Sequence, residues 1–144
     1  MHIQLLRADV TSLKVDAIVN PASPQLKNGA RVGSAVAEPG GNLLCRFIIT
    51  AVVPRMGEGD EDAKLRLATI ASLERAEELA LASVGLPAMG AGAFGFTFER
   101  CARVMLGATL DFRKRARSVE RVIYCLFGQE SYETFERVLA ELDA

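Results

Sequence analysis

The sequence lacks several features that would point to familiar catalytic classes. Tryptophan is absent, and His2 is the only histidine among the 144 residues. A Ser-His-Asp or Cys-His apparatus would have to bring this near-terminal side chain into a site, and no His/Cys cluster has the spacing of zinc ligands. The composition therefore argues against histidine-dependent catalysis, and we expect no metal site.

Cysteines and long apolar runs are also scarce. The three cysteines, Cys45, Cys101 and Cys125, are an odd number, widely spaced and set in apolar surroundings. This usage predicts buried free thiols in a reducing compartment, and hence a cytoplasmic protein. No run of about 18 apolar residues occurs, and residues 1–10 lack the design of a signal peptide, so we expect neither a membrane span nor a membrane partner.

The chain has almost equal numbers of basic and acidic residues, 17 and 18, so its formal net charge is only −1. Without a global basic field, we do not expect a nucleic-acid partner. The local basic stretch Arg113, Lys114, Arg115 and Arg117 is interpreted as a solvated helix end whose cations suit the helix dipole. A chain of this length has room for one core, so residues 1–144 are expected to form a single domain.

Short apolar runs alternate with longer amphipathic segments along the chain. Strands are predicted over residues 3–6, 15–20, 33–37, 47–53, 84–88 and 119–127, with a loop over residues 21–31. Helices are predicted after the acidic residues 58–62, over about 99–116, and from a cap at Ser131 to Leu142. The first helix is expected to bury Leu67, Ile70, Leu73, Ala76 and Ala80. This alternation predicts a mostly parallel sheet whose ligand would bind beyond the carboxyl ends of the strands.

A glycine-rich segment, Gly90-Ala91-Gly92-Ala93-Phe94-Gly95, lies between a predicted strand and a predicted helix. Its missing side chains allow a ligand to approach the backbone closely. Successive N–H groups can then converge on an anion, helped by the N-terminus of the helix that follows. A tight strand-to-helix turn without a ligand is the alternative interpretation.

This segment also matches the G-x-G-x-x-G fingerprint of dinucleotide-binding domains, which is weak evidence alone. The fingerprint should be followed, about 20 positions on, by an acidic residue at the end of the next strand. Asp111 has nearly that spacing but falls inside a predicted helix, and only one further strand remains. No Lys-Ser or Lys-Thr follows the loop, so a Walker P-loop is not indicated either.

Four segments carry patterns that belong together: residues 8–11 (ADVT), 15–23 (VDAIVNPAS), 33–54 (GSAVAEPGGNLLCRFIITAVVP) and 86–96 (LPAMGAGAFGF). In this order they resemble the G-D-I-T, V-D-A-I-V-N-A-A-N, G-E-A-V…I-I-H-x-V-x-P and P-A-[IL]-[SG]-T-G-x-[YF]-G-[YF] segments of the macrodomain family. The matches span most of the chain, and four in sequence order are far more specific than one. The resemblance implies an α/β fold, a three-layer α/β/α sandwich with a mixed, mostly parallel central sheet.

The resemblance also implies a ligand, ADP-ribose or an ADP-ribosylated macromolecule, and no cofactor. Asp9 would accept a hydrogen bond from the adenine amino group, a role that suits an acceptor-only carboxylate. Phe127 would pack on the adenine, and the glycine-rich backbone would hold the diphosphate and distal ribose. A simple turn or cap remains an alternative role for Asp9, and core packing remains one for Phe127. The expected ligand-binding residues are Asp9, Val10, Asn20, Ser23, Gly90, Ala91, Gly92, Ala93, Phe94 and Phe127.

The chain departs from the family pattern in one shortened segment and at two single positions. Family members carry another glycine-rich loop and a helix, with a pattern like G-G-G-V-D-G-A-I, between N-A-A-N and G-E-A-V. Only residues 24–32 separate those landmarks here, so the first phosphate loop and its helix are expected to be largely missing. (Aligning residues 32–36 with V-D-G-A-I instead would move the gap downstream.) Ser23 replaces the last Asn of N-A-A-N, and Thr50 replaces the His of I-I-H.

These departures weigh against catalysis, because the groups that position water in hydrolytic relatives are not found. We therefore expect a weak, non-hydrolytic binding module for ADP-ribose or ADP-ribosylated partners. Two alternatives stay open. One is an enzyme that hydrolyses ADP-ribosyl groups or processes ADP-ribose-1''-phosphate, and the other is a scaffold that has lost its ligand.

Overall fold

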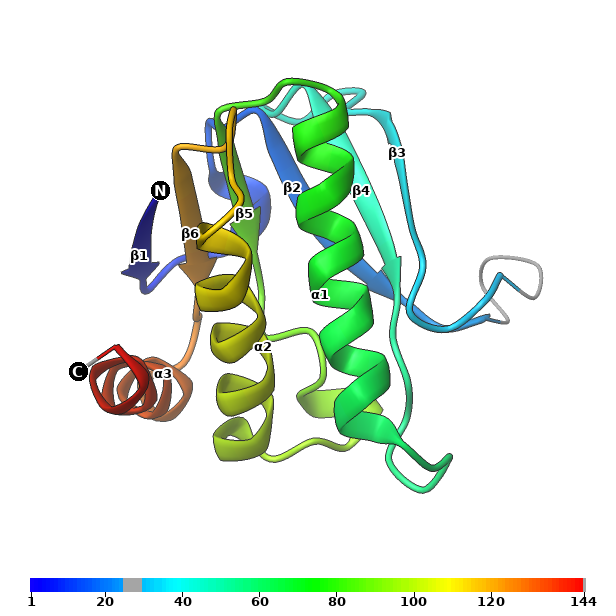
Figure 1. The fold of residues 1–144 in the computed structure, drawn as a ribbon, viewed down its shortest axis with the longest axis vertical. Coiled ribbons are helices and arrows are strands. Elements are labelled where there is room, and N and C mark those ends of the chain that lie inside the picture. Colours follow the sequence, from blue (N-terminus) through cyan, green and yellow to red (C-terminus); the bar gives the residue numbers. More distant parts are fainter. Residues whose placement is uncertain (25–29, 144) are drawn as a thin grey trace.

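A computed structural model describes residues 1–24 and 30–143 and contains one six-stranded sheet (Figure 1). Residues 25–29, in the middle of the expected loop 21–31 and of the shortened segment 24–32, lie outside the described residues. The strands are β1 (His2–Leu6), β2 (Ala17–Ala22), β3 (Ala35–Pro39), β4 (Phe47–Val52), β5 (Ser83–Leu86) and β6 (Arg121–Cys125). The helices are α1 (Glu61–Glu78), α2 (Phe98–Arg113) and α3 (Gln129–Leu142), with 3-10 turns η1 (Val10–Ser12) and η3 (Gly92–Phe94).

The strand order is β1-β6-β5-β2-β4-β3, and every neighbouring pair is parallel except β3 with β4. The expected fold class, α/β with a mixed, mostly parallel sheet, is therefore confirmed. The parallel strands place their carboxyl ends at one edge of the sheet, at the bottom of Figure 1. The loops that follow β1, β5 and β6 meet at that edge, because these three strands are neighbours in the sheet.

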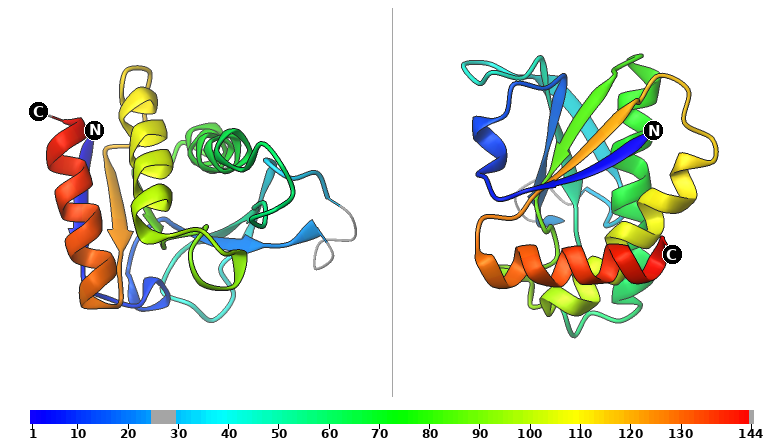
Figure 2. Two further views of the ribbon diagram at one scale, coloured as in Figure 1. Left: turned by 90° about the horizontal axis from the view of Figure 1, so that it is seen from below. Right: turned by 90° about the vertical axis from the view of Figure 1, so that its left-hand side faces the viewer.

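The core is divided unequally between the two faces of the sheet. Buried residues of α1, α2 and α3 join one large cluster with alternate strand residues such as Val19, Ile49 and Tyr124. Figure 2 shows α1 and α2 side by side over one face, with α3 beside the edge strand β1. The opposite face carries a smaller cluster around Ile18 and Ile123. Among the described residues, its covering layer contains η1 and no α-helix.

The buried face of α1 differs from the prediction. Leu67 is 58% exposed, whereas Leu65, Leu73 and Ala76 are fully buried. The true inner face also includes Thr69 and Ser72, whose hydroxyls donate to carbonyls four residues earlier at 2.9 and 2.8 Å. These internal hydrogen bonds allow two polar residues to be buried, which a search for apolar spacing cannot detect.

Two predicted boundaries also change. β2 continues through Pro21, because its pairing with β5 ends at Ile18 and only β4 lies beside it there, so a residue without an N–H is tolerated. Ser131 is not the N-cap of α3; Gly128 is, and the Ser131 hydroxyl donates to the Gly128 carbonyl at 2.9 Å. The three cysteines are free and buried, as expected. In the described part of the chain, no helix is long and apolar enough to cross a membrane.

Candidate functional site

Two adjoining cavities lie at the carboxyl edge of the sheet. The smaller one, about 300 Å³, is lined by Ala8, Asp9 and Val10 after β1 together with Pro87, Cys125 and Phe127. The larger one, about 520 Å³, includes the glycine-loop residues Ala91 and Gly92 and the start of α3. Because Pro87, Cys125 and Phe127 line both cavities, the two form a single crevice. Five predicted residues, Asp9, Val10, Ala91, Gly92 and Phe127, are thus brought together around it.

Asp9 caps η1. Its Oδ1 atom accepts hydrogen bonds from the Thr11 N–H at 2.9 Å and from the Thr11 hydroxyl at 2.8 Å. The Thr11 N–H, followed by the Thr11 hydroxyl, lowers the pKa of Asp9, so the carboxylate is charged at neutral pH. Oδ2 has no hydrogen-bond partner within residues 1–24 and 30–143. The capping role is therefore real, and it leaves one carboxylate oxygen for a ligand.

Cys125 forms part of the crevice wall and is 4% exposed. Burial, together with the nearby charge of Asp9, raises the pKa of its thiol to about 11. A protonated thiol is a poor nucleophile, so Cys125 provides apolar surface in this crevice.

Phe127 follows β6 and is 80% exposed, which is unusual for such a large apolar side chain. The alternative of an ordinary core phenylalanine is therefore wrong. Its position at the junction of the two cavities gives the crevice an aromatic face that is open to solvent. Such a surface can stack against a flat heteroaromatic ring.

The three glycines of the loop serve different purposes. A Cβ on Gly90 would lie 2.9 Å from the Phe96 ring and 3.1 Å from Leu65, so Gly90 is required by internal packing. Gly92 and Gly95 have φ angles of 69° and 90°, a conformation that favours glycine. Only Gly92 combines this backbone with open space around the absent Cβ and a place on the crevice wall. Close approach of a ligand to the backbone is therefore possible at Gly92.

Ala93 and Phe94 belong to the same 3-10 turn but do not line the two cavities. The Arg55 guanidinium lies 5.6 Å from the centre of the Phe94 ring and donates to the Ala93 carbonyl at 3.3 Å. The Met56 N–H donates to the Phe94 carbonyl at 2.9 Å. The segment after β4 therefore holds the glycine loop in place. Arg55 was not singled out from the sequence, where it is one of many isolated arginines.

Asn20 and Ser23 lie one strand further along the same edge, on and after β2. Asn20 is exposed and pairs in register with Thr50, whereas Ser23 is buried with 4% exposure. Neither lines the two cavities. Asn20 and Ser23 could contact a ligand only if the ligand extended beyond the crevice towards β2. Their role in ligand binding therefore stays a prediction.

The larger cavity also includes Gln129 and Glu130 in the first turn of α3, which the sequence analysis missed. Both residues directly follow the last predicted strand, and residues after parallel strands border the ligand crevice of such sheets. Their position in the sequence could therefore have identified them as site residues. Asp9 and Glu130 are the only charged residues among the described side chains that line the crevice. An anionic ligand would therefore depend on backbone N–H groups for its neutralisation.

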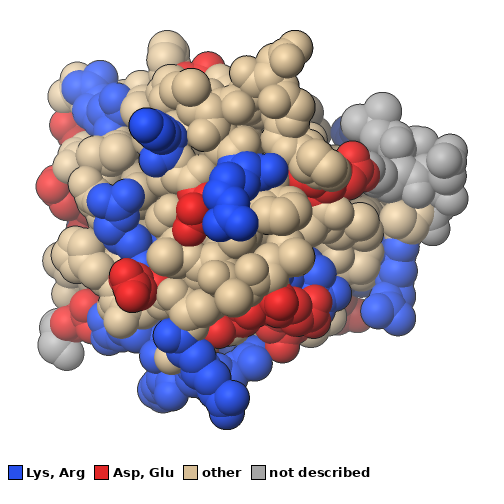
Figure 3. All heavy atoms as spheres, turned by 90° about the horizontal axis from the view of Figure 1, so that it is seen from above, with Lys and Arg blue, Asp and Glu red and all other residues tan. Residues whose placement is uncertain are grey.

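The other end of the sheet offers no comparable arrangement of predicted residues. Figure 3 views the molecule from that end and shows Lys and Arg beside Asp and Glu, with no extended surface of one sign. His2 lies there, in a separate hollow lined also by Glu120 and Arg121. The only histidine is therefore remote from the crevice. Asp111, considered above for a dinucleotide site, lies in α2 and forms an ion pair with Arg66 of α1 at 2.7 Å.

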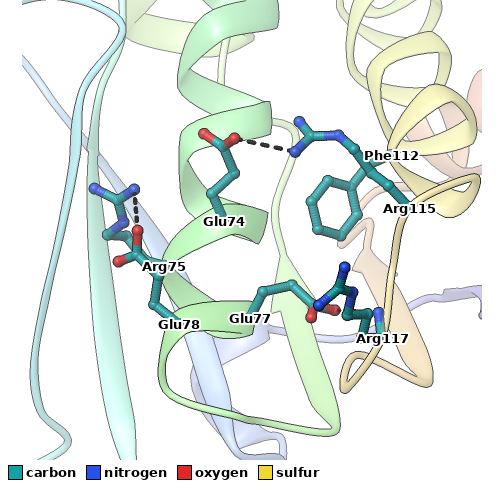
Figure 4. A pocket seen from close by; sticks show the side chains of 7 residues that line it. All are labelled: Glu74, Arg75, Glu77, Glu78, Phe112, Arg115 and Arg117. Carbon is teal, nitrogen blue, oxygen red and sulfur yellow. Dashed lines mark hydrogen bonds and ion pairs between the residues drawn. The ribbon is translucent and has the colours of Figure 1, made fainter.

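A cavity of about 510 Å³ lies between the C-terminal ends of α1 and α2 (Figure 4). Glu74 and Arg115 point toward each other across it and pair at 3.2 Å, with the Arg115 guanidinium over the Phe112 ring. The Glu77 carboxylate accepts backbone N–H groups of residues 117–119 at 2.9–3.1 Å. These contacts tie the loop before β6 to α1, so Glu74, Glu77 and Arg115 are engaged in holding the fold together.

Comparison with known proteins agrees with this geometry. The Macro domain family model matches residues 18–105, which is more than half of the chain. A macro domain-containing protein of Caldanaerobacter subterraneus is 30% identical, over 98% of this chain and 97% of its own length. The chain therefore belongs to the macro domain family.

Solved structures of macrodomains share the fold of this chain. The Oceanobacillus iheyensis macrodomain with ADP superimposes with a TM-score of 0.89 at 20% identity, covering 96% of this chain and 90% of that one. The Trypanosoma brucei macrodomain in complex with ADP gives 0.86 at 26% identity, covering 96% and 69%.

The alignment with the Caldanaerobacter protein also shows a difference in chain length. The alignment with the Caldanaerobacter protein spans 171 positions, although 98% of this 144-residue chain is only about 141 residues. That relative therefore has about 30 residues without a counterpart here, in keeping with a shortened chain.

Proposed function

We propose that the crevice binds ADP-ribose, either free or as the ADP-ribosyl group of a macromolecule, and that the chain is a binding module without hydrolytic activity. The observation that carries this proposal is Phe127, a phenylalanine 80% exposed at the junction of two cavities that also hold Asp9 and Gly92. The aromatic face and the carboxylate suit the ring and the amino group of an adenine, and the accessible glycine backbone suits a diphosphate. The complex of the Trypanosoma brucei macrodomain with ADP supports this choice of ligand.

Each part of the crevice has a chemical role in this proposal. The adenine ring stacks on Phe127, and its amino group donates to Oδ2 of Asp9, since a carboxylate can only accept. The diphosphate lies against the backbone at Ala91 and Gly92, and close approach is sterically open at Gly92. The distal ribose then extends towards Phe94 and Ser23.

The side chains that the described residues place at and around the crevice support the non-hydrolytic part of this proposal. General-base activation of water needs a side chain within hydrogen-bond reach of that water. His2 is at the other end of the sheet, and the Cys125 thiol is protonated at neutral pH. One oxygen of Asp9 is committed to the η1 cap. Glu130, the other carboxylate of the crevice, borders the larger cavity, whereas the distal ribose in this proposal extends beyond that cavity towards Phe94 and Ser23. Affinity is expected to be modest, because no Lys or Arg in residues 1–24 and 30–143 lines the crevice to form charge-assisted contacts with the diphosphate.

The test is a calorimetric titration with ADP-ribose, using AMP and NAD as comparison ligands. Asp9→Asn is the sharpest variant, because asparagine can still cap η1 through its side-chain oxygen but presents a donor in place of Oδ2. We expect saturable ADP-ribose binding by the wild-type chain and a loss of at least tenfold in Asp9→Asn, with unchanged thermal stability. Asp9→Ala should lose both the binding and the cap.

A flat titration up to millimolar ADP-ribose would contradict the proposal and favour a scaffold that has lost its ligand. Release of free ADP-ribose from an ADP-ribosylated protein would contradict the non-hydrolytic part alone.

A further inference from the structure

The crevice contains a second carboxylate, which the roles above do not use. Glu130 lines the larger cavity together with Phe127, Ala91 and Gly92. Its backbone carbonyl accepts from the Thr134 hydroxyl at 2.8 Å. Across the described ranges 1–24 and 30–143, its carboxylate has no hydrogen-bond or ion-pair partner. Both of its oxygens are therefore available to a ligand.

The path of the proposed ligand brings one chemical group close to this carboxylate. The base lies in the smaller cavity beside Asp9, and the diphosphate lies in the larger cavity beside Gly92. The ribose that joins them must therefore pass the junction at Phe127, within the cavity that Glu130 borders. The vicinal hydroxyls of that ribose are two hydrogen-bond donors, and an ionised carboxylate accepts two such bonds.

We infer that Glu130 determines specificity at the ribose next to the adenine: it accepts hydrogen bonds from the vicinal hydroxyls and disfavours ligands that carry a phosphate there. The preferred ligands are thus adenine nucleoside diphosphates with an unmodified 2'-hydroxyl. This inference rests on the proposed function, because it assumes that the adenine stacks on Phe127.

The charges around the crevice set the size of the expected effect. An added 2'-phosphate would bring nearly two negative charges to a wall on which Asp9 and Glu130 are the only charged side chains among the described residues. In water, two like charges about 4 Å apart repel enough to weaken binding roughly fivefold. For a phosphate the loss should be at least about tenfold at low ionic strength, and it should shrink as salt is added because Glu130 is exposed.

The experiment compares ADP-ribose with ADP-ribose 2'-phosphate by calorimetry on three versions of the 144-residue chain: wild type, Glu130→Gln and Glu136→Gln. Wild type should bind ADP-ribose at least about tenfold more tightly than the 2'-phosphate. In Glu130→Gln the ratio should fall to within about threefold, mainly through tighter binding of the phosphorylated ligand. Glu136→Gln removes the same charge from an exposed site later in α3 that does not line the cavity, so it should keep the wild-type ratio.

Equal affinities in the wild type, or an unchanged ratio in Glu130→Gln, would overturn the inference while leaving ADP-ribose binding intact. A ratio that falls equally in Glu136→Gln would also overturn it, since the effect would then come from net charge alone. A wild-type chain that binds neither ligand would overturn the proposed function and this inference together.

Discussion

Phe127 allows binding and stability to be tested separately. Because its side chain is 80% exposed, Phe127→Ala removes little buried surface, and the free energy of unfolding should change by no more than about 0.5 kcal/mol. Removing an aromatic platform under a base costs about 1–3 kcal/mol of binding. This corresponds to a roughly 5- to 150-fold rise in the Kd for ADP-ribose. Phe127→Trp keeps an aromatic face and should retain binding.

The assay is a calorimetric titration paired with thermal unfolding of the same samples. Leu44→Ala is the matched control, because Leu44 is an apolar side chain, 63% exposed, in the loop before β4 at the opposite edge of the sheet. It should change neither Kd nor Tm. Wild-type affinity in Phe127→Ala would refute the stacking role. A fall of many degrees in its Tm would instead show that the ring supports the fold.

Three further predictions concern stability. Tyr124→Phe removes a buried hydroxyl that lies 2.7 Å from the Thr109 hydroxyl, so the urea midpoint should fall by an amount equivalent to about 1–2 kcal/mol; an unchanged midpoint would contradict this. Gly107→Ala, inside α2 with open space at the Cβ position, should stabilise by about 0.5–1 kcal/mol, and a lower Tm would show an unrecognised contact. For Glu77, burial raises the pKa, but the N–H groups of Val119, Ser118 and Arg117 outweigh it and leave the pKa lowered. The stabilisation by this carboxylate is therefore present above its unfolded pKa and lost as pH falls through the folded value. Unfolding midpoints measured from about pH 5 to pH 3 should fall less steeply in Glu77→Gln than in wild type, and parallel curves would refute this.

Local patterns were sufficient for much of the fold. The strand before the glycine loop, the alternation of strands with helices and the family assignment all follow from short segments, because strand and helix periods and turn residues are local properties. The glycine loop was also found from the sequence, but the separate reasons for its glycines were not. Gly90 is explained only by Phe96, six residues on, and by Leu65 of α1.

The inner face of α1 could not be predicted from apolar spacing. Thr69 and Ser72 are buried because they bond to their own helix, and Leu67 is exposed despite its character. Which face of a helix is buried depends on the surfaces that it meets, and those surfaces come from strands far away in the sequence.

The sequence by itself determined the family, the α/β class and five of the residues that line the crevice, since these depend on motifs and local periodicity. Only the tertiary structure decided that Asp9, Gly92 and Phe127 share one crevice, that Phe127 faces solvent and that Glu130 stands beside it. The physical reason is the strand order. β1, β6 and β5 are neighbours in the sheet, so the loops after them meet at one edge, although Asp9 and Phe127 lie near opposite ends of the chain.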